Sequence, residues 1–507
     1  MSDVPPTVSP ERVYPPPEPV YPPPEPYTPN FLRRIRRGLY SWFGLLNEWD
    51  FRIPVGALRF MGLNLLLVND PAAVRQVMVS AVEAFPKHPY TLWILEPLIG
   101  RAIFSVNGAE WLQQRRLLDQ AFQVAQLQRV LPQMQGAVEA LMARLEAQVD
   151  GCLVDGCPID ADAEMTLVTA DVIVRTILSR PLEGAEAEAI FAAFARYQKR
   201  AGRALMLRFL RLPRRRLQGY LATHAAPIRQ WITAAIEARL GGDGHADRSG
   251  AACRWEKGHT CDHISDTAYP QDLLQALIEA RDPQSGARFS RDGLVDQVCF
   301  LFLAGHETSA SSLGMAVYLL GRFPDVQQRL RAEVLQVLGS RAGALDRPLG
   351  FEELRQLSYG AAIFNETLRL YPPVSFFIRE AQADTELAGS RCPLRSLVTL
   401  SPWVIQRHEQ HWSEPNAFRP ERFLTDTSGE ATSAEDRRWA RDAFLPYGLG
   451  PRKCPGAAFA QQEALLVLAE LVRRFEVRPD PEHEPELVAR LTLRSRNGIR
   501  VRLHRLS

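Results

Sequence analysis

Apolar residues recur at helical spacing over most of this 507-residue chain, and this pattern predicts a mainly α-helical fold with a small β portion. Weak alternation predicts strands within residues 51–69, on either side of Gly62–Asn64, and within 374–405. The dipeptide Asn497-Gly498 is typical of a tight turn and predicts a hairpin between Leu491–Ser495 and Ile499–Leu503. Helices are predicted over residues 71–82, 108–124, 126–149, 160–179, 184–203, 214–240, 271–281, 291–321, 324–338, 351–370 and 457–475.

The first 30 residues are rich in proline, and the block Val-Tyr-Pro-Pro-Pro-Glu-Pro occurs twice, at 13–19 and 20–26. Proline fixes φ and removes a donor, so residues 1–30 are predicted to be a disordered, solvated leader. The alternative is that they dock in an aromatic groove on a partner. From Phe31 to Trp49, apolar residues and arginines recur at helical spacing and predict a first helix that packs on the body of the protein. The alternative is that this helix lies on an anionic membrane surface.

Composition narrows the classes of function. The formal net charge of +2 argues against a generic nucleic-acid binder. The seven cysteines are odd in number and scattered, so we expect no disulfide framework and a cytoplasmic location, and no apolar run is long enough for a transmembrane anchor. Residues 241–268 are predicted to be a flexible insertion, and a zinc site is the alternative for the residues Cys253, His259, Cys261 and His263.

One stretch carries the candidate chemistry: Phe444-Leu-Pro-Tyr-Gly-Leu-Gly-Pro-Arg-Lys-Cys454-Pro-Gly, which is followed directly by a predicted apolar helix. A thiol must become a thiolate to bind a metal, and a helix N-terminus favours the thiolate. Gly448 and Gly450 allow the backbone to turn tightly against a flat ligand, and Arg452 is placed to pair with a carboxylate of that ligand.

The pattern Tyr447-x-x-Gly450-x-Arg452-x-Cys454-x-Gly456 resembles the haem-binding loop of the cytochrome P-450 superfamily. The resemblance implies that Cys454 is the axial ligand of the haem iron, and that the loop with Gly450, Arg452 and Gly456 binds the haem. Glu366 and Arg369, at i and i+3 of one helix, and Arg422 in Pro-Glu-Arg-Phe resemble the buried structural network of the same family.

The stretch Ala304-Gly305-His306-Glu307-Thr308 lies in a long apolar helix and resembles the oxygen-activating segment of the family. The resemblance implies that Gly305 makes room above the iron, and that Glu307 and Thr308 deliver protons. The alternative is a packing glycine and a threonine bonded to the carbonyl four residues earlier. Trp111, Arg115 and Arg379 resemble partners of the haem propionates.

The resemblance covers about residues 31–507 and implies a single haem domain of the cytochrome P-450 fold with haem b as cofactor. The implied activity is a monooxygenase that uses O₂ and oxidises an apolar small molecule such as a lipid, terpenoid or aromatic compound. Two electrons would come from a separate donor, a ferredoxin with ferredoxin reductase. The enzyme is expected to be a monomer without nucleic-acid partners. Peripheral membrane contact stays open. Alternatives are a peroxygenase, an O₂-independent isomerase and a non-catalytic haem sensor. The implied substrate pocket contains Tyr90, Trp93, Ile94, Leu95, Ala304, Val374, Phe376 and Phe377.

Overall fold

The computed structural model describes most of the chain. Residues 242–270 lie outside it, and with them the cluster Cys253, His259, Cys261 and His263 and almost all of the predicted insertion. The described residues are 19–24, 26, 31–38, 40–60, 62–152, 156–182, 184–209, 213–241, 271–341, 343–345, 347–424, 438–439 and 441–506.

Helices dominate the described residues, which confirms the mainly α-helical prediction. Because the apolar stripes of these helices face one another, they pack around one continuous core. The helices are α1 Phe31–Gly38, η1 Trp42–Leu45, η2 Glu48–Phe51, α2 Pro71–Arg75, η3 Gln76–Ser80, α3 Pro89–Leu92, α4 Glu96–Ile99, α5 Gly108–Ala121, α6 Val124–Asp150, α7 Ala161–Leu178, α8 Gly184–Phe209, α9 Arg214–Gly241, α10 Leu273–Glu279, α11 Arg291–Arg322, α12 Pro324–Leu338, η5 Gly339–Arg341, α13 Phe351–Leu354, α14 Ser358–Leu370, α15 Pro402–Ile405, η6 Pro420–Phe423, η8 Gly450–Arg452 and α17 Ala457–Arg474.

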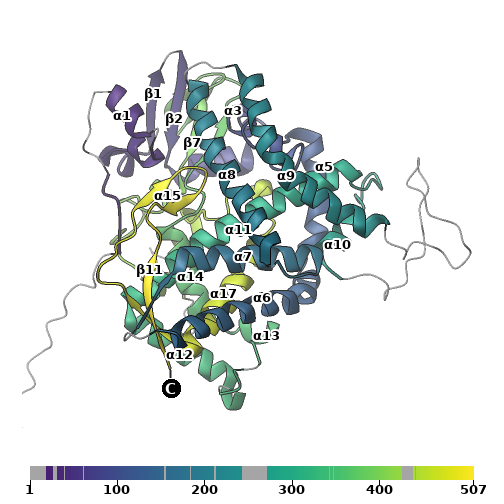
Figure 1. Cartoon of the computed structure of the whole chain (residues 1–507). Coiled ribbons are helices and arrows are strands. Elements are labelled where there is room, and N and C mark those ends of the chain that lie inside the picture. Colours follow the sequence, from purple (N-terminus) through teal and green to yellow (C-terminus); the bar gives the residue numbers. More distant parts are fainter. Residues whose placement is uncertain are drawn as a thin grey trace, which may run out of the picture.

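Helix α11 crosses the middle of the molecule, with α7 and α17 beside it (Figure 1). The Ser290 side chain caps its start by accepting a hydrogen bond from the Gly293 N–H. Most of its side chains are buried, because helices pack on nearly every face of it. A helix with apolar residues on nearly all of its faces can form one wall of an internal site.

The β portion lies mainly at one end of the molecule (Figure 1). The larger sheet has the order β1-β2-β7-β4, in which β2 and β7 are parallel and the other neighbours antiparallel. A second sheet has the order β3-β11-β8, and β9 pairs with β10 and β5 with β6. The strands are β1 Val55–Phe60, β2 Leu63–Val68, β3 Cys157–Asp160, β4 Phe377–Glu380, β5 Thr385–Leu387, β6 Ser390–Cys392, β7 Leu397–Leu400, β8 Phe475–Pro479, β9 Leu487–Ala489, β10 Leu493–Ser495 and β11 Arg500–Arg505.

Two local predictions were wrong. The single helix expected over 31–49 is divided into α1, η1 and η2, because Ser41 and Leu46 take up extended backbone conformations. The strands on either side of Asn497-Gly498 do not pair with each other, because β10 pairs with β9 and β11 pairs with β3 and β8.

Two further expectations are corrected, one about the N-terminal leader and one about disulfide bonds. Pro19–Pro24, part of the expected solvated leader, lie against the body, where Val20 and Tyr21 bond and stack with other residues. Cys152 and Cys157 form a disulfide with a Cα–Cα distance of 5.7 Å, because the end of α6 lies beside β3. Within the described part of the chain, no helix is both long and apolar enough to cross a membrane.

Candidate active site

The Cys454 loop is held between η8 and α17. The Cys454 N–H donates to the Tyr447 carbonyl at 2.9 Å, which closes the loop on itself. Gly448 and Gly450 have φ values of 70° and 65°, the left-handed region that favours glycine. A Cβ atom on Gly450 would overlap the carbonyl oxygen of Met78, so glycine also permits the close approach of the loop to η3.

The Cys454 side chain is exposed, whereas the free thiols Cys299 and Cys392 are buried. Protein nevertheless surrounds the Cys454 sulfur on most sides, and desolvation raises the pKa of the thiol. The Gly456 N–H, Arg115 and Lys453 act in the opposite direction and lower this pKa. The sulfur is therefore accessible to a ligand and lies among donors and cations that favour its anionic form.

Three cations gather near this loop, and none of them forms an ion pair with a carboxylate of the described residues. Lys87 forms a β-bridge with Arg379 of β4, and its ammonium donates to the carbonyls of Ile103 at 2.7 Å and Phe104 at 2.8 Å. Burial, with the charges of Arg452 and Arg379, lowers the pKa of Lys87 to about 6. Burial and Arg452 lower the pKa of Arg379 to about 10. Burial lowers these pKa values most, the neighbouring charges add to the effect, and cations gathered in this way indicate a site built for an anionic ligand.

Arg452 completes this group of cations. Its guanidinium carbon lies 5.5 Å from the centre of the Trp111 ring, and its Nη1 donates to the Phe85 carbonyl at 3.1 Å. Its Nε is buried and has no hydrogen-bond partner among the described residues. Arg115, which was expected to join Trp111 at a propionate, instead pairs with Asp119 at 2.8 Å and donates to the Lys453 carbonyl.

These residues fit a haem. The buried Arg379, the half-buried Lys87 and Arg452 and the Trp111 indole N–H suit two propionate carboxylates, and the accessible Cys454 sulfur suits the iron. Lys87 was missed by the sequence analysis, because its place beside Arg379 arises from a contact between distant segments.

One face of α11 is less buried than the rest. Phe300, Ala304 and Thr308, spaced by four residues, are half-buried on a helix whose other positions are mostly buried. The Thr308 hydroxyl donates to the Ala304 carbonyl at 2.7 Å, the bond that the alternative interpretation predicted. Gly305 does not make room on this face as expected, because its missing Cβ would overlap the side chain of Ile173 in α7. Gly305 thus permits the close packing of α7 on α11.

Glu307 points into a polar network rather than towards the half-buried face. It is buried, and the Thr492 hydroxyl donates to its Oε1 at 2.7 Å. Burial raises the pKa of Glu307, while Arg494 and the Thr492 hydroxyl act against that rise. Arg494 in turn bonds Asp162 at 3.0 Å and Thr166 at 3.3 Å, and it is partly exposed. Glu307 therefore lies beside a group of polar side chains, of which Arg494 and Asp162 are partly exposed. Sequence spacing gave no signal for Thr492.

The residues of the predicted structural network meet behind this site. Glu366 forms two bonds with Arg369, at 2.6 and 2.7 Å, and lies 3.4 Å from Arg422. All three side chains are fully buried. A buried group of charges of this kind fixes the relative positions of the segments that it joins, provided that each of its donors has a hydrogen-bond partner. Arg369 also donates to the carbonyls of Gln406, Pro415 and Ala417.

A second buried carboxyl lies in α17. Glu463 is fully buried, neither of its oxygens makes a hydrogen bond within the described residues, and Ser309 of α11 lies beside it. Burial raises the pKa of Glu463 to about 8. A neutral carboxylic acid is therefore the form that this environment favours near neutral pH. It joins the helix that follows Cys454 to the segment that contains Thr308.

The predicted pocket residues are only partly brought together. Trp93, Ile94 and Leu95 are buried, and the Ile94 carbonyl accepts a hydrogen bond from the Tyr197 hydroxyl at 2.8 Å. The side chain of Tyr90 lies outside the described residues.

The residues after α14 divide between two neighbourhoods. Phe376 packs on Trp42 of η1 with ring centres 5.4 Å apart, so it contributes to the core beside the N-terminal segment. Phe377 lies next to Gly448 of the cysteine loop, and Val374 is half-buried.

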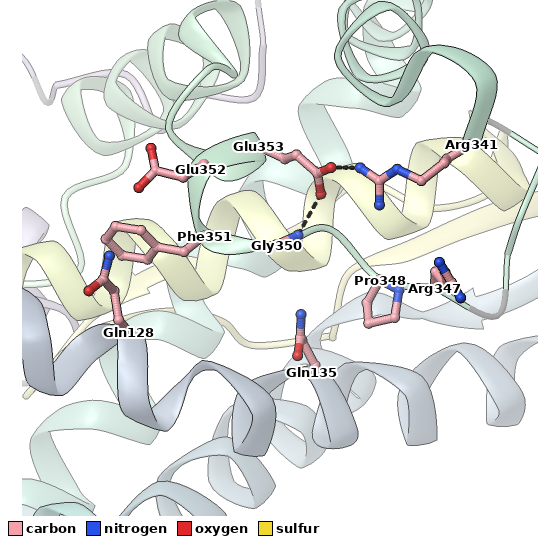
Figure 2. Close-up of a pocket in the computed structure, with 9 residues that line it drawn as sticks. All are labelled: Gln128, Gln135, Arg341, Arg347, Pro348, Gly350, Phe351, Glu352 and Glu353. Carbon is pink, nitrogen blue, oxygen red and sulfur yellow. Dashed lines mark hydrogen bonds and ion pairs between the residues drawn. The ribbon is translucent and has the colours of Figure 1, made fainter.

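A surface hollow of about 640 Å³ lies between α6 and the segment around α13 (Figure 2). Its polar groups are engaged with one another, because Glu353 accepts from the Gly350 N–H and pairs with Arg341. None of the predicted site residues lines it. Its lining residues are Gln128, Gln135, Arg341, Arg347, Pro348, Gly350, Phe351, Glu352 and Glu353.

The accessible cysteine, the buried cations and the central helix define a haem-thiolate site. A family model described as cytochrome P-450 matches residues 51–501, and the chain belongs to this family. It is a monooxygenase of the cytochrome P-450 type, and membership in the family implies a cysteine-ligated haem.

Relatives and solved structures agree with this assignment. The chain is 31% identical to cyclooctatin synthase of Streptomyces melanosporofaciens over 417 residues, 81% of this chain and 80% of the relative. It is 29% identical to pentalenene oxygenase of Streptomyces avermitilis over 438 residues, 85% of this chain and 86% of the relative. The fold is similar to that of a crystal structure of cytochrome CYP102L1, with a TM-score of 0.77, 21% identity and coverage of 97% of this chain and 100% of the other.

Proposed function

We propose that this protein hydroxylates or otherwise oxidises a cyclic terpenoid, using O₂ and two electrons delivered by a separate ferredoxin and its reductase. The observation that carries this proposal is the accessible Cys454 thiol near the cluster of cations formed by Lys87, Arg379 and Arg452. That combination suits a thiolate-bound haem with two propionates. Glu307 and Thr308 favour a monooxygenase over the peroxygenase, isomerase and sensor alternatives.

The substrate class is inferred from relatives. Two bacterial relatives are named as a cyclooctatin synthase and a pentalenene oxygenase, and a third as a cyclooctat-9-en-7-ol 5-monooxygenase, 34% identical over 210 residues. The buried apolar residues Trp93, Ile94 and Leu95 are compatible with a hydrocarbon substrate. A carbon skeleton without charge would also need no ion-pair partner in the pocket.

When bound, haem supplies the oxygen activation that the polypeptide lacks. The Cys454 thiolate would hold the iron, and Arg379, Arg452 and Lys87 would orient the cofactor through its propionates. Glu307, which accepts from Thr492 and lies near the charge of the partly exposed Arg494, would bring protons in. Thr308 would then hold a proton at its hydroxyl, whose oxygen keeps free lone pairs while the hydrogen bonds Ala304.

Electron delivery is proposed to occur at the Cys454 side of the molecule. Lys453, next to the ligand cysteine, is exposed and suits an acidic donor such as a ferredoxin. A monomeric state, a cytoplasmic location and a peripheral membrane contact remain predictions from the sequence.

Two measurements test the proposal. The reduced carbonyl complex of the purified protein should show the Soret position of thiolate ligation, and Cys454→Ser should abolish it. A panel of cyclic diterpenes, sesquiterpenes and fatty acids is then titrated for a low-to-high-spin shift, followed by product analysis with a surrogate ferredoxin system. A spin shift and product with fatty acids alone would contradict the terpenoid assignment and leave the haem-thiolate assignment intact.

A further inference from the structure

The segment Pro19–Pro24 is held on the body by the backbone of one residue. The Val20 N–H donates to the Tyr318 hydroxyl at 3.1 Å, and the Tyr371 hydroxyl donates to the Val20 carbonyl at 2.7 Å. Tyr318 comes from α11, and Tyr371 directly follows α14. Both polar groups of Val20 are thus satisfied by side chains from two different helical segments, as in sites that bind extended peptides.

The next residue supplies side-chain recognition. The Tyr21 ring stacks on Trp403 with centres 5.9 Å apart, and the guanidinium carbon of Arg407 lies 4.9 Å from the Tyr21 ring centre. Pro22 and the following prolines fix an extended conformation, which lowers the entropy lost on docking. The site therefore recognises a tyrosine residue that is followed by proline.

Arg407 gives an independent sign that the site is built around an aromatic ligand. Its side chain is 2% exposed, and its Nε and Nη1 have no hydrogen-bond partner among the described residues. It lies instead over the rings of Trp403, Tyr371 and Tyr21, at 3.8, 5.7 and 4.9 Å from their centres. A buried guanidinium with two nitrogens that lack hydrogen-bond partners is costly, and each aromatic face reduces that cost. Removal of Tyr21 would leave one face of Arg407 uncovered.

We propose that the recess formed by Tyr318, Tyr371, Trp403 and Arg407 is a peptide-binding site for an extended Val-Tyr-Pro segment, filled by the chain's own residues 20–24. The proposal is independent of the haem chemistry. The identical heptapeptide at 13–19 carries a second copy of the ligand in the same chain. Because a tethered ligand has an effective concentration in the millimolar range, the chain's own segment should exclude free peptide.

Binding in trans is the first test, and it uses the full chain loaded with haem. The probe is a fluorescein-labelled Val-Tyr-Pro-Pro-Pro-Glu-Pro peptide, followed by anisotropy. The variant Tyr14→Ala with Tyr21→Ala, which disables both copies, should bind the peptide at least tenfold more tightly than the unmodified chain. A peptide with alanine for tyrosine should not bind. Equal binding to both proteins, or equal binding of the alanine peptide, would overturn the proposal.

The matched control is Tyr14→Ala with Tyr21→Phe, which keeps the ring over Arg407 and should exclude the probe as the unmodified chain does. Failure of this control to exclude the probe would count against recognition of the ring.

A second measurement needs no variant that disturbs the recess. In the Tyr14→Ala chain, fragments of the two repeats differ in mass, so hydrogen exchange reports on the second repeat alone. Prolines leave few amides there, and the Val20 amide should exchange at least tenfold more slowly than the same amide in a free peptide of residues 17–26, in which the valine is not N-terminal. Exchange at the rate of the free peptide would refute docking.

Discussion

At the scale of single residues, Glu463 shows how burial sets a protonation state. Its folded-state pKa of about 8 lies above the unfolded value of about 4.3, so the folded protein binds a proton that the unfolded chain releases between these values. The stability of the protein should therefore fall as pH rises through this window, by about 1.4 kcal/mol per unit at most.

Glu463→Gln imitates the neutral acid at every pH. We expect the variant and the parent to unfold alike near pH 5, and the variant to be more stable by about 3 kcal/mol at pH 8. Denaturant unfolding at several pH values measures this difference. Glu139→Gln, at an exposed position of α6, is the control and should show no such divergence. Parallel curves for the parent and Glu463→Gln would contradict the assignment of a neutral acid.

Lys87 is one of the residues that the sequence analysis missed, and its charge is predicted to bind the propionates of the cofactor. Lys87→Met keeps the length of the side chain and removes the ammonium, so haem should transfer to apomyoglobin at least tenfold faster than from the parent. Lys199→Met, on the exposed surface of α8, is the control for the loss of a positive charge. Identical rates of haem loss for the parent and Lys87→Met would show that Lys87 does not contact the propionates.

At the scale of elements, Gly450 links the cysteine loop to η3. Gly450→Ala would combine a left-handed φ with overlap of the Met78 carbonyl, and we expect a loss of about 3 kcal/mol in unfolding free energy. Gly62→Ala also has a positive φ of 83° but meets nothing within 4 Å, so about 1 kcal/mol is expected. Calorimetry of the two variants separates the cost of the overlap with Met78 from the cost of the left-handed backbone conformation. Equal losses of unfolding free energy in both variants would show that the overlap has no effect.

The contact between Thr492, the residue directly before β10, and Glu307 of α11 is the element-scale feature that concerns catalysis. Thr492→Val keeps the shape of the side chain and removes the donor to Glu307, so protons should reach the site more slowly. We expect a lower fraction of electrons recovered in product, about tenfold slower turnover and a larger solvent isotope effect. Ser495→Ala, at the end of β10, is the control. Unchanged coupling and isotope effect would exclude this route.

Element by element, the sequence predicted what local periodicity determines. The long helices α11 and α17 were placed within one or two residues, because their apolar patterns are continuous. The hairpin at Asn497-Gly498 failed for a tertiary reason. The Asn497 side chain accepts from the Glu486 N–H at 2.8 Å and donates to the Glu484 carbonyl at 2.9 Å, so it joins β10 to the segment before β9.

The residues of the candidate site also divide into those that local motifs predicted and those that only the folded structure brings together. Cys454, Glu366 and Arg369 belong to motifs that are contiguous in the chain, and the resemblance of these motifs to those of the family predicted them. Lys87 and Thr492 acquire their neighbours only when distant segments fold together, and no local pattern marks them. Gly305 was found by its motif but assigned to the wrong neighbour, because a sequence does not show which face of a helix a glycine opens.

At the scale of the whole molecule, a net charge of +2 is too small to steer an electron donor over long range. Docking must then depend on local charge at the face that carries Lys453, next to Cys454. Arg116 adds little to this local charge, because it pairs with the buried Asp282 at 2.5 Å.

Lys453→Gln should therefore raise the KM for ferredoxin about tenfold at low ionic strength, and the difference should vanish at high salt, where exposed charges are screened. Lys199→Gln, on α8, removes the same charge elsewhere and should leave this KM unchanged. The reduced carbonyl spectrum of Lys453→Gln serves to show that the cysteine loop is intact. If both variants slow electron transfer equally, the donor responds to the total charge of the molecule rather than to the face beside the ligand cysteine.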